Sequence, residues 1–130
     1  MNRALELHDS NVAQVCGDGD RLSVQFSEAY VHASEGTLGV SAGDGYLQPA
    51  ALVFVGASWS NVSPKLNGKL SDGTIEIDGR AVSLIPIPFD ASGKVTAELV
   101  FVSGERLRIS AQSVSCSVYG EASWVEAYAG

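Results

Sequence analysis

The sequence predicts an all-β protein that folds as an antiparallel β-sandwich or flattened barrel of about ten short strands. Three observations support this prediction. Apolar and polar residues alternate with period 2 in segments along the whole chain, as in half-buried strands. No stretch of about 11 residues carries the i, i+3, i+4, i+7 spacing of an amphipathic helix. Many of the 14 glycines stand beside Asp or Ser, a combination typical of tight turns.

The N-terminal part of the chain predicts strands at 4–7, 12–16, 22–26 and 29–33. The segment LHDSNV (7–12) is expected to turn the chain between the first two, and GDGD (17–20) is a strong hairpin signal before the third. Leu22, Val24 and Phe26 alternate with polar residues, which predicts one buried face. In the fourth strand Tyr30 and His32 share a face; a single helical turn beginning at Ser27 is the competing interpretation.

The middle of the chain contains fewer regular strands. Residues 34–46 hold four glycines and few large apolar groups, so we expect a long loop there. A strand through the core is expected at 47–55, followed by a turn-rich stretch at 56–72. Short strands follow at 74–77 and 81–85. Pro86 and Pro88 lack backbone donors, which places them at a sheet edge or outside the sheet. Another turn is expected at 90–93.

The last third predicts the most regular part of the sheet. Strands at 95–102 and 106–110 are joined by a Ser-Gly turn, and two more are expected at 114–119 and 124–128. Trp124 is expected to close the core, because a large aromatic side chain buries more area than its neighbours. On this view, removal of the last seven residues would unfold the protein.

Length and charge exclude several classes of protein. The 130 residues fit one domain, 1–130, and 45% hydrophobic residues are enough for a folded core. The net charge of −7, with scattered basic residues, argues against nucleic acid and anionic membranes as partners. No apolar run approaches the roughly 20 residues of a membrane span, and the N-terminus lacks the apolar run of a signal peptide. We therefore expect a cytoplasmic protein.

Cys16 and Cys116 lie 100 residues apart in sequence, each in an alternating segment. In a reducing compartment they are expected to be two buried free thiols. A disulfide between the terminal segments is the alternative that the sequence leaves open, because it does not reveal the separation of the Cα atoms.

His8 and Asp9 are the sharpest candidates for a site. The simpler interpretation makes Asp9 a turn cap and His8 a packed strand end. The functional alternative adds His32, because two histidines and a carboxylate suit a transition metal if they converge. Nothing in their spacing enforces convergence, so no cofactor is predicted.

Other chemistry has weaker support in the sequence. Tyr30, Tyr46 and Trp59 are aromatic candidates for ligand contacts, the last two as stacking platforms for a carbohydrate or lipid-like ligand. The stretch GASWS (56–60) lacks the final glycine of a nucleophile elbow, and no phosphate-binding loop is present. An enzyme is therefore not the favoured interpretation, although the sequence does not decide this question.

The segment ALELHDSNVAQVCGDGDRLSVQFSEAYVH (4–32) resembles the opening of small all-β bacterial proteins of uncharacterised activity. These begin with a strand, His-Asp-Ser, a second strand, an acidic Gly turn and an alternating third strand. Similar His-Asp openings occur in small immunity-type proteins of bacterial toxin systems. The resemblance implies an all-β fold and singles out His8, Asp9 and Ser10, and implies no activity.

These observations favour a non-enzymatic module that binds another protein, or itself, through a sheet edge. The motivation is an acidic, strand-rich chain with a long Gly-rich loop and no assembled catalytic set. The alternative is a metal-dependent or small-ligand-binding protein centred on His8, Asp9 and His32.

Overall fold

The computed structural model of the protein describes residues 1–60 and 66–130, which form ten strands and no helix. All pairings between these strands are antiparallel, which confirms the predicted all-β antiparallel class. The strands are β1 (Asn2–Asp18), β2 (Arg21–Ser34), β3 (Gly43–Val55), β4 (Ser58–Trp59), β5 (Gly68–Ile77), β6 (Arg80–Ala81), β7 (Ile85–Pro86), β8 (Phe89–Phe101), β9 (Arg106–Val118) and β10 (Ser123–Tyr128).

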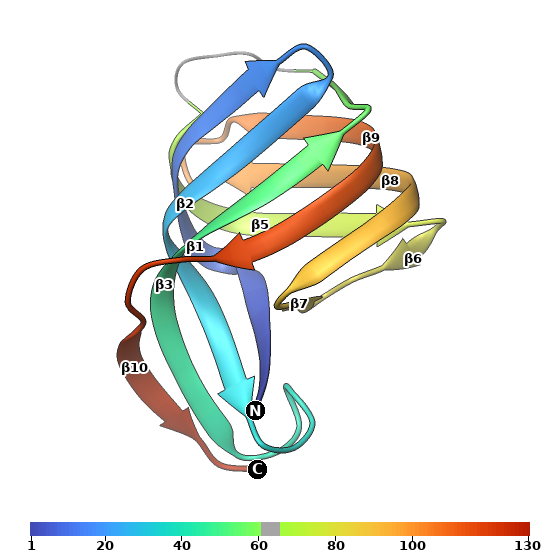
Figure 1. The fold of residues 1–130 in the computed structure, drawn as a ribbon. Coiled ribbons are helices and arrows are strands. Elements are labelled where there is room, and N and C mark those ends of the chain that lie inside the picture. Colours follow the sequence, from blue (N-terminus) through green and yellow to red (C-terminus); the bar gives the residue numbers. More distant parts are fainter. Residues whose placement is uncertain (61–65) are drawn as a thin grey trace.

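Six of these strands close into a barrel in the order β3-β2-β1-β5-β8-β9 (Figure 1). Closure is made by β9 pairing back onto β3, where Leu52 lies opposite Cys116. The architecture is therefore a closed barrel with additional strands, rather than two separate sheets. Closure satisfies the strand edges that an open sheet would leave unpaired.

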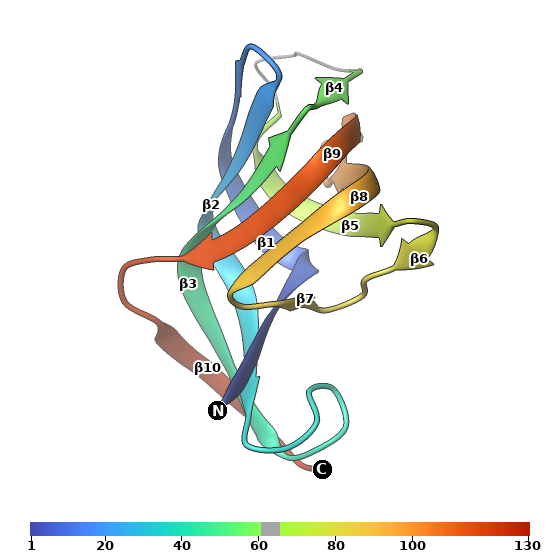
Figure 2. The same ribbon diagram turned by 45° about the vertical axis from the view of Figure 1, so that its right-hand side comes forward.

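Strand β3 pairs with β2 along one edge and with two different strands along the other. Its second half, from Ala50 to Val55, pairs with β9 inside the barrel, and its first half, from Gly43 to Leu47, pairs with β10. As a result, the ends of β1, β2 and β3 continue below the barrel and carry β10 at their edge (Figure 2). We call this part the extension: residues 2–6 of β1, 29–34 of β2, 43–47 of β3, and β10.

The barrel interior is filled by the apolar face of each strand. Leu22, Val24 and Phe26 are each at most 1% exposed, which confirms the predicted alternation. The largest fully buried side chains are Phe26, Phe54 and Phe101, from β2, β3 and β8. Alternation along a strand sends every second side chain to this interior, so long barrel strands bury apolar residues at a regular interval.

Several predicted short strands are parts of longer ones. The expected strands at 4–7 and 12–16 belong to the single 17-residue strand β1, and those at 22–26 and 29–33 belong to the 14-residue β2. The helical turn considered at Ser27 is wrong for the same reason. The expected turn at 90–93 lies inside β8, where the register shifts between Ser92 and Val95. Bulges let a strand continue through residues that favour turns.

The outcome for the loop and proline predictions is mixed. The loop expected at 34–46 is shorter, because β3 already begins at Gly43. Pro86 pairs only with β1, in the two-residue strand β7, so the predicted edge position is confirmed. Part of the turn-rich stretch at 56–72, residues 61–65, lies outside the described residues. Within the described ranges, no helix has the length and apolar character needed to cross a membrane.

Trp124 does not close the core. It is 61% exposed on β10, and no residue of that strand is buried. The prediction assumed that the last strand joins the barrel, whereas β10 pairs with β3 below it. A large aromatic side chain stays exposed when its strand lies outside the barrel.

Candidate functional site

His8, Asp9 and Ser10 form an irregularity within β1, not a turn between two strands. The register with β2 jumps between Glu6 and Asn11, and Asp9 has a φ of 71°. Ser10 is fully buried; its Oγ donates to the Glu6 carbonyl at 2.6 Å and accepts from the Tyr30 amide at 2.9 Å. The hydroxyl of Ser10 thereby replaces ladder hydrogen bonds that the bulge interrupts.

The side chains of His8 and Asp9 lie outside the barrel and are about half exposed to solvent. The Asp9 carboxylate lies 3.5 Å from His8 Nδ1 and 3.4 Å from Lys69 Nζ. These contacts are those of a surface ion pair and do not involve His32. In the described part of the chain, no three His, Cys, Asp or Glu side chains converge as metal ligands, so His8, Asp9 and His32 do not form such a group.

A second group of polar side chains gathers on one face of the extension. We call it the tyrosine–glutamate cluster, and its members come from β1, β2 and β10: Glu6, Tyr30, His32, Glu126 and Tyr128. The Tyr30 hydroxyl donates to the Glu126 carboxylate and also contacts the Tyr128 hydroxyl. The hydroxyls of Tyr30 and Tyr128 are thus in contact although the two residues lie 98 positions apart in sequence.

His32 occupies the centre of the cluster, as its predicted shared face with Tyr30 implies. Its ring centroid lies 5.1 Å from that of Tyr30 and 5.3 Å from that of Tyr128, against which it stacks at 18°. His32 Nε2 lies 3.4 Å from the Glu6 carboxylate. His32 therefore contacts both β1, through Glu6, and β10, through Tyr128.

One glycine of β3, Gly45, makes room for the cluster. Gly45 lies opposite His32 on one side and Glu126 on the other. A Cβ atom at Gly45 would overlap the Tyr30 hydroxyl and would lie 2.9 Å from the Tyr128 hydroxyl. Because glycine has no side chain, the two phenols lie directly over the β3 backbone.

The environment of the cluster keeps its phenols neutral. Burial raises the pKa of Tyr30 well above its ordinary value, and the hydrogen bonds with Glu126 and Tyr128 raise it further. Burial also raises the pKa of Tyr128. The cluster therefore offers neutral donors and a carboxylate acceptor, which hold strands together but do not supply a nucleophile at neutral pH.

The two aromatic residues predicted as stacking platforms lie far apart in the fold. Tyr46 lies on β3, on the face of the extension opposite the cluster, and lines a small pocket there. Trp59 lies on β4 opposite the buried Ile109, and its ring packs against Gly17 and the barrel core. Trp59 therefore covers the end of the barrel interior and is not paired with Tyr46.

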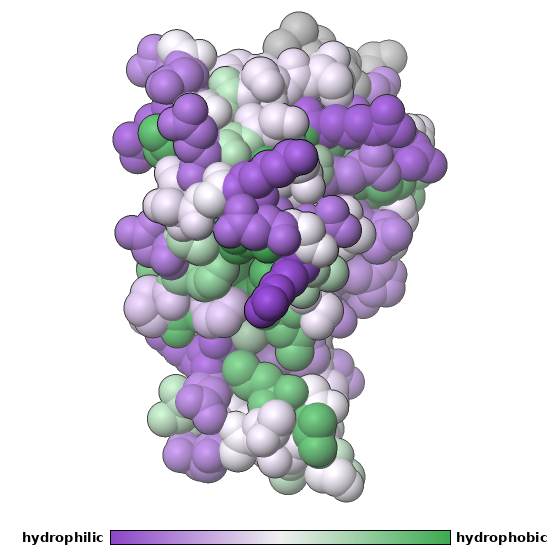
Figure 3. All heavy atoms as spheres, turned by 90° about the vertical axis from the view of Figure 1, so that its right-hand side faces the viewer, coloured by the Kyte–Doolittle hydropathy of each residue, from purple (hydrophilic) through white to green (hydrophobic). Residues whose placement is uncertain are grey.

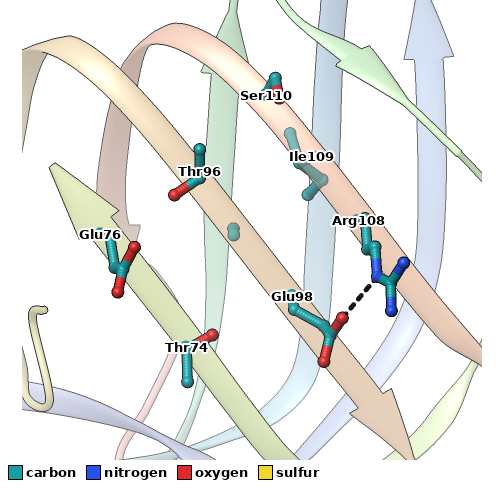
Figure 4. A pocket seen from close by; sticks show the side chains of 8 residues that line it. Thr74, Glu76, Thr96, Glu98, Arg108, Ile109 and Ser110 are labelled. Atoms are coloured by element: carbon teal, nitrogen blue, oxygen red, sulfur yellow. Dashed lines mark hydrogen bonds and ion pairs between the residues drawn. The ribbon is translucent and has the colours of Figure 1, made fainter. Parts of the chain in front are cut away.

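The outer face of β5, β8 and β9 carries a polar hollow of about 410 Å³. Figure 4 shows Thr74, Glu76 and Thr96 around it, with Glu98 directed toward Arg108. Arg108 Nε donates to the Glu98 carboxylate at 2.6 Å, and Arg106 lies 3.2 Å from it. The hydrogen bond from Arg108 lowers the pKa of Glu98, so this carboxylate is held ionised and paired, and is unsuited to proton transfer.

The sequence pattern indicated Tyr30 and His32 as candidates but not Glu6, Glu126 and Tyr128. The alternation of Glu126 and Tyr128 was a usable signal, because it places both on one face of the last strand. Nothing in the sequence indicates that this strand pairs with the first half of β3. The partners of Tyr30 are therefore set by topology.

Comparisons of the chain with protein-family models, with curated proteins and with solved structures found no match. Functional inference therefore rests on the chemistry and exposure of this chain's own residues.

Proposed function

We propose that this chain is a non-enzymatic binding module whose β10 edge pairs with an extended segment of another protein. One observation carries the proposal: β10 is a six-residue strand with no buried residue, and it stands at the end of the sheet with β3 as its strand partner. The outer edge of such a strand presents unpaired N–H and C=O groups that can recruit another strand.

The exposed apolar residues support this location. Seven large hydrophobic side chains of the described residues are exposed, and only Val55 and Val102 lie on the barrel away from the extension. The other five lie on or beside the extension: Met1, Val40, Tyr119, Trp124 and Val125. Figure 3 shows hydrophobic side chains on this narrow lower end of one face. Such a concentration is typical of an interaction surface.

The charge around β10 defines the chemistry of the partner. Segments 35–47 and 119–130 contain four acidic residues and no Lys or Arg: Glu35, Asp44, Glu121 and Glu126. A segment that combines apolar side chains with Lys or Arg is complementary to this surface. A second copy of the chain would bring the same acidic residues together, and like charges on paired strands are destabilising. A different, basic partner is therefore favoured over self-association.

A cytoplasmic location belongs to the same proposal. Both cysteines are free thiols. Free thiols fit a reducing compartment, where cytosolic partners would meet this edge.

The test is a selection of peptides from a random display library against the immobilised full chain. We expect binders that are extended, basic and apolar, and that slow hydrogen exchange of residues 123–128. Val125→Lys places a positive charge beside the free edge and should abolish binding, because a lysine on an edge opposes strand addition. Val102→Lys, the same change at an exposed valine of the barrel, should leave binding unchanged.

Two outcomes would overturn the proposal. One is a binding peptide whose protection maps to the barrel and that ignores Val125→Lys. The other is a selection that yields no binder while light scattering shows a monomer at every concentration.

A further inference from the structure

A small apolar pocket lies on the face of the extension opposite the tyrosine–glutamate cluster. Its volume is about 160 Å³, and its lining includes Arg3, Val31, Ala33, Tyr46, Gln48 and Ala122. Strand pairing aligns these residues, since Arg3 lies opposite Ala33 and Val31 lies opposite Tyr46. The pocket thus has no residue in common with the cluster.

The floor of the pocket is apolar. Val31 and Ala33 are 1% and 4% exposed, and the Tyr46 side chain stands beside them. An apolar cavity of about 150 Å³ is large enough to hold a benzene ring. A pocket of about 160 Å³ therefore accommodates one ring or a short alkyl chain.

Arg3 brings a cationic side chain to the pocket, and because the pocket surface is almost entirely apolar, its guanidinium group lies at the edge of the pocket. It is half-buried and takes part in none of the ion pairs found in residues 1–60 and 66–130. The nearest acid across the ladder is Asp44, on the far side of Ala33, and that carboxylate accepts a hydrogen bond from the Trp124 indole at 3.0 Å.

Gln48 decides which end of the pocket suits an anion. Its Nε2 donates to the Gly120 carbonyl at 3.1 Å, and its Oε1 is a buried acceptor without a partner. A carboxylate would be repelled by this oxygen and attracted by the guanidinium group of Arg3, whose N–H groups match a carboxylate in geometry.

We propose that this pocket binds a small apolar monocarboxylate. Its ring or alkyl chain packs on Val31 and Ala33, and its carboxylate pairs with Arg3. This inference is independent of strand pairing at β10, because the pocket lies over β1, β2 and β3 and needs no second chain.

Benzoate is the probe, with benzamide as its neutral isostere, and both are titrated into the ¹⁵N-labelled full chain while amide shifts are followed by NMR. We expect benzoate to saturate shifts at residues 31, 33 and 48 with a Kd of about 1 mM, and benzamide to bind about tenfold more weakly. Arg3→Gln should weaken benzoate about tenfold and leave benzamide unchanged.

Two further variants separate recognition from folding. Arg80→Gln, on the exposed strand β6, removes the same charge elsewhere and should leave benzoate binding intact. Ala33→Leu fills the floor and should abolish binding of both probes while the amide spectrum stays dispersed.

The proposal is overturned if benzoate at concentrations well above about 1 mM produces no saturating amide shifts. It is also overturned if the Arg3→Gln and Arg80→Gln variants bind benzoate with equal affinity. Shifts that gather around Lys69 or Arg108 would also overturn it, because they would indicate nonspecific attraction to exposed cations. None of these results bears on peptide binding at β10, so the two proposals fail separately.

Discussion

The hydroxyl group of Tyr30 lies over Gly45, at the position where any larger residue would place its Cβ atom. Tyr30 comes from β2 and contacts Glu126 and Tyr128 on β10, while Gly45 belongs to the strand between them. The contacts that attach β10 to β2 therefore depend on residue 45 being a glycine, because they pass directly over it.

Gly45→Ala is expected to loosen β10 without unfolding the barrel. The added methyl group displaces the Tyr30 and Tyr128 hydroxyls, whereas the barrel half of β3 starts at Ala50 and keeps its partner β9. Hydrogen exchange at 123–128 should accelerate by about tenfold, the equivalent of about 1.4 kcal/mol, with barrel amides unchanged. Adding Tyr30→Phe and Tyr128→Phe, which remove the two hydroxyls, should partly restore protection. Unchanged exchange in Gly45→Ala would refute this account of the cluster.

Alkaline pH is expected to weaken the extension. Burial and its hydrogen bonds raise the pKa of Tyr30 in the folded protein, so an unfolded or detached Tyr30 releases its proton first, near its ordinary pKa of about 10. The stabilisation is complete below that pH and is lost as the pH rises above it. The protection factors at 123–128, which correct for the base-catalysed rise in intrinsic exchange, should therefore decrease above about pH 10 in the wild type.

Tyr30→Phe is the control for this pH dependence, because the variant has no proton to release at that position. It should start with a looser β10 and show a smaller further change on raising the pH. Tyr119→Phe, at an exposed tyrosine outside the cluster, should behave like the wild type. An identical alkaline response in all three proteins would assign the effect to other groups.

The sequence predicted those features that depend on neighbouring residues. Leu22, Val24 and Phe26 face the core as their alternation required, and the GDGD turn joins β1 and β2. Both signals are local, since period 2 and tight-turn chemistry do not depend on which strand pairs with which.

Features that depend on register or on distant pairing were missed. Cys16 was expected to be buried, but it is exposed. The register shift between Val12 and Gln14 inserts one residue into β1, which turns Val15 toward the core and Cys16 away from it. One extra residue reverses every later side chain of a strand. The prediction for Trp124 failed for a different reason. The pairing of β10 with β3 joins residues about 80 apart in sequence, and local patterns do not reveal such a pairing.

The two cysteines should differ strongly in reactivity. Cys116 is 2% exposed, and burial raises its pKa to about 11, whereas Cys16 lies on the surface. A thiol reagent at neutral pH should modify one thiol per native chain and two in denaturant, because the thiolate is the reactive form. Cys16→Ser should remove the fast reaction. Rapid modification of both native thiols would contradict the burial of Cys116.

The two tryptophans are expected to contribute unequally to stability. Trp59 packs on Gly17 and the barrel core, so Trp59→Ala should lower the free energy of unfolding by about 2 kcal/mol, less than a fully buried aromatic because the ring is partly exposed. Trp124→Ala, at a side chain 61% exposed, should cost about 0.5 kcal/mol. Chemical denaturation checks both. A ligand platform at Trp59 without a packing role would leave its variant as stable as the wild type.

Removal of residues 121–130 is expected to leave the barrel folded, contrary to the prediction from sequence. The six barrel strands keep their closed ladder, and the backbone amide of Tyr119 still donates to the Pro49 carbonyl at 3.0 Å. The truncation removes the strand partner of the first half of β3, which becomes a solvent-exposed, unpaired edge. The truncated chain should retain the far-ultraviolet spectrum of a β protein and a cooperative thermal transition, with Tyr30 and His32 newly accessible.

The truncated chain should also lose binding to any peptide selected through β10, because that peptide's partner strand is gone. A truncated chain without a cooperative transition would show that β10 is needed for the barrel itself, and that the extension and the barrel fold as one unit.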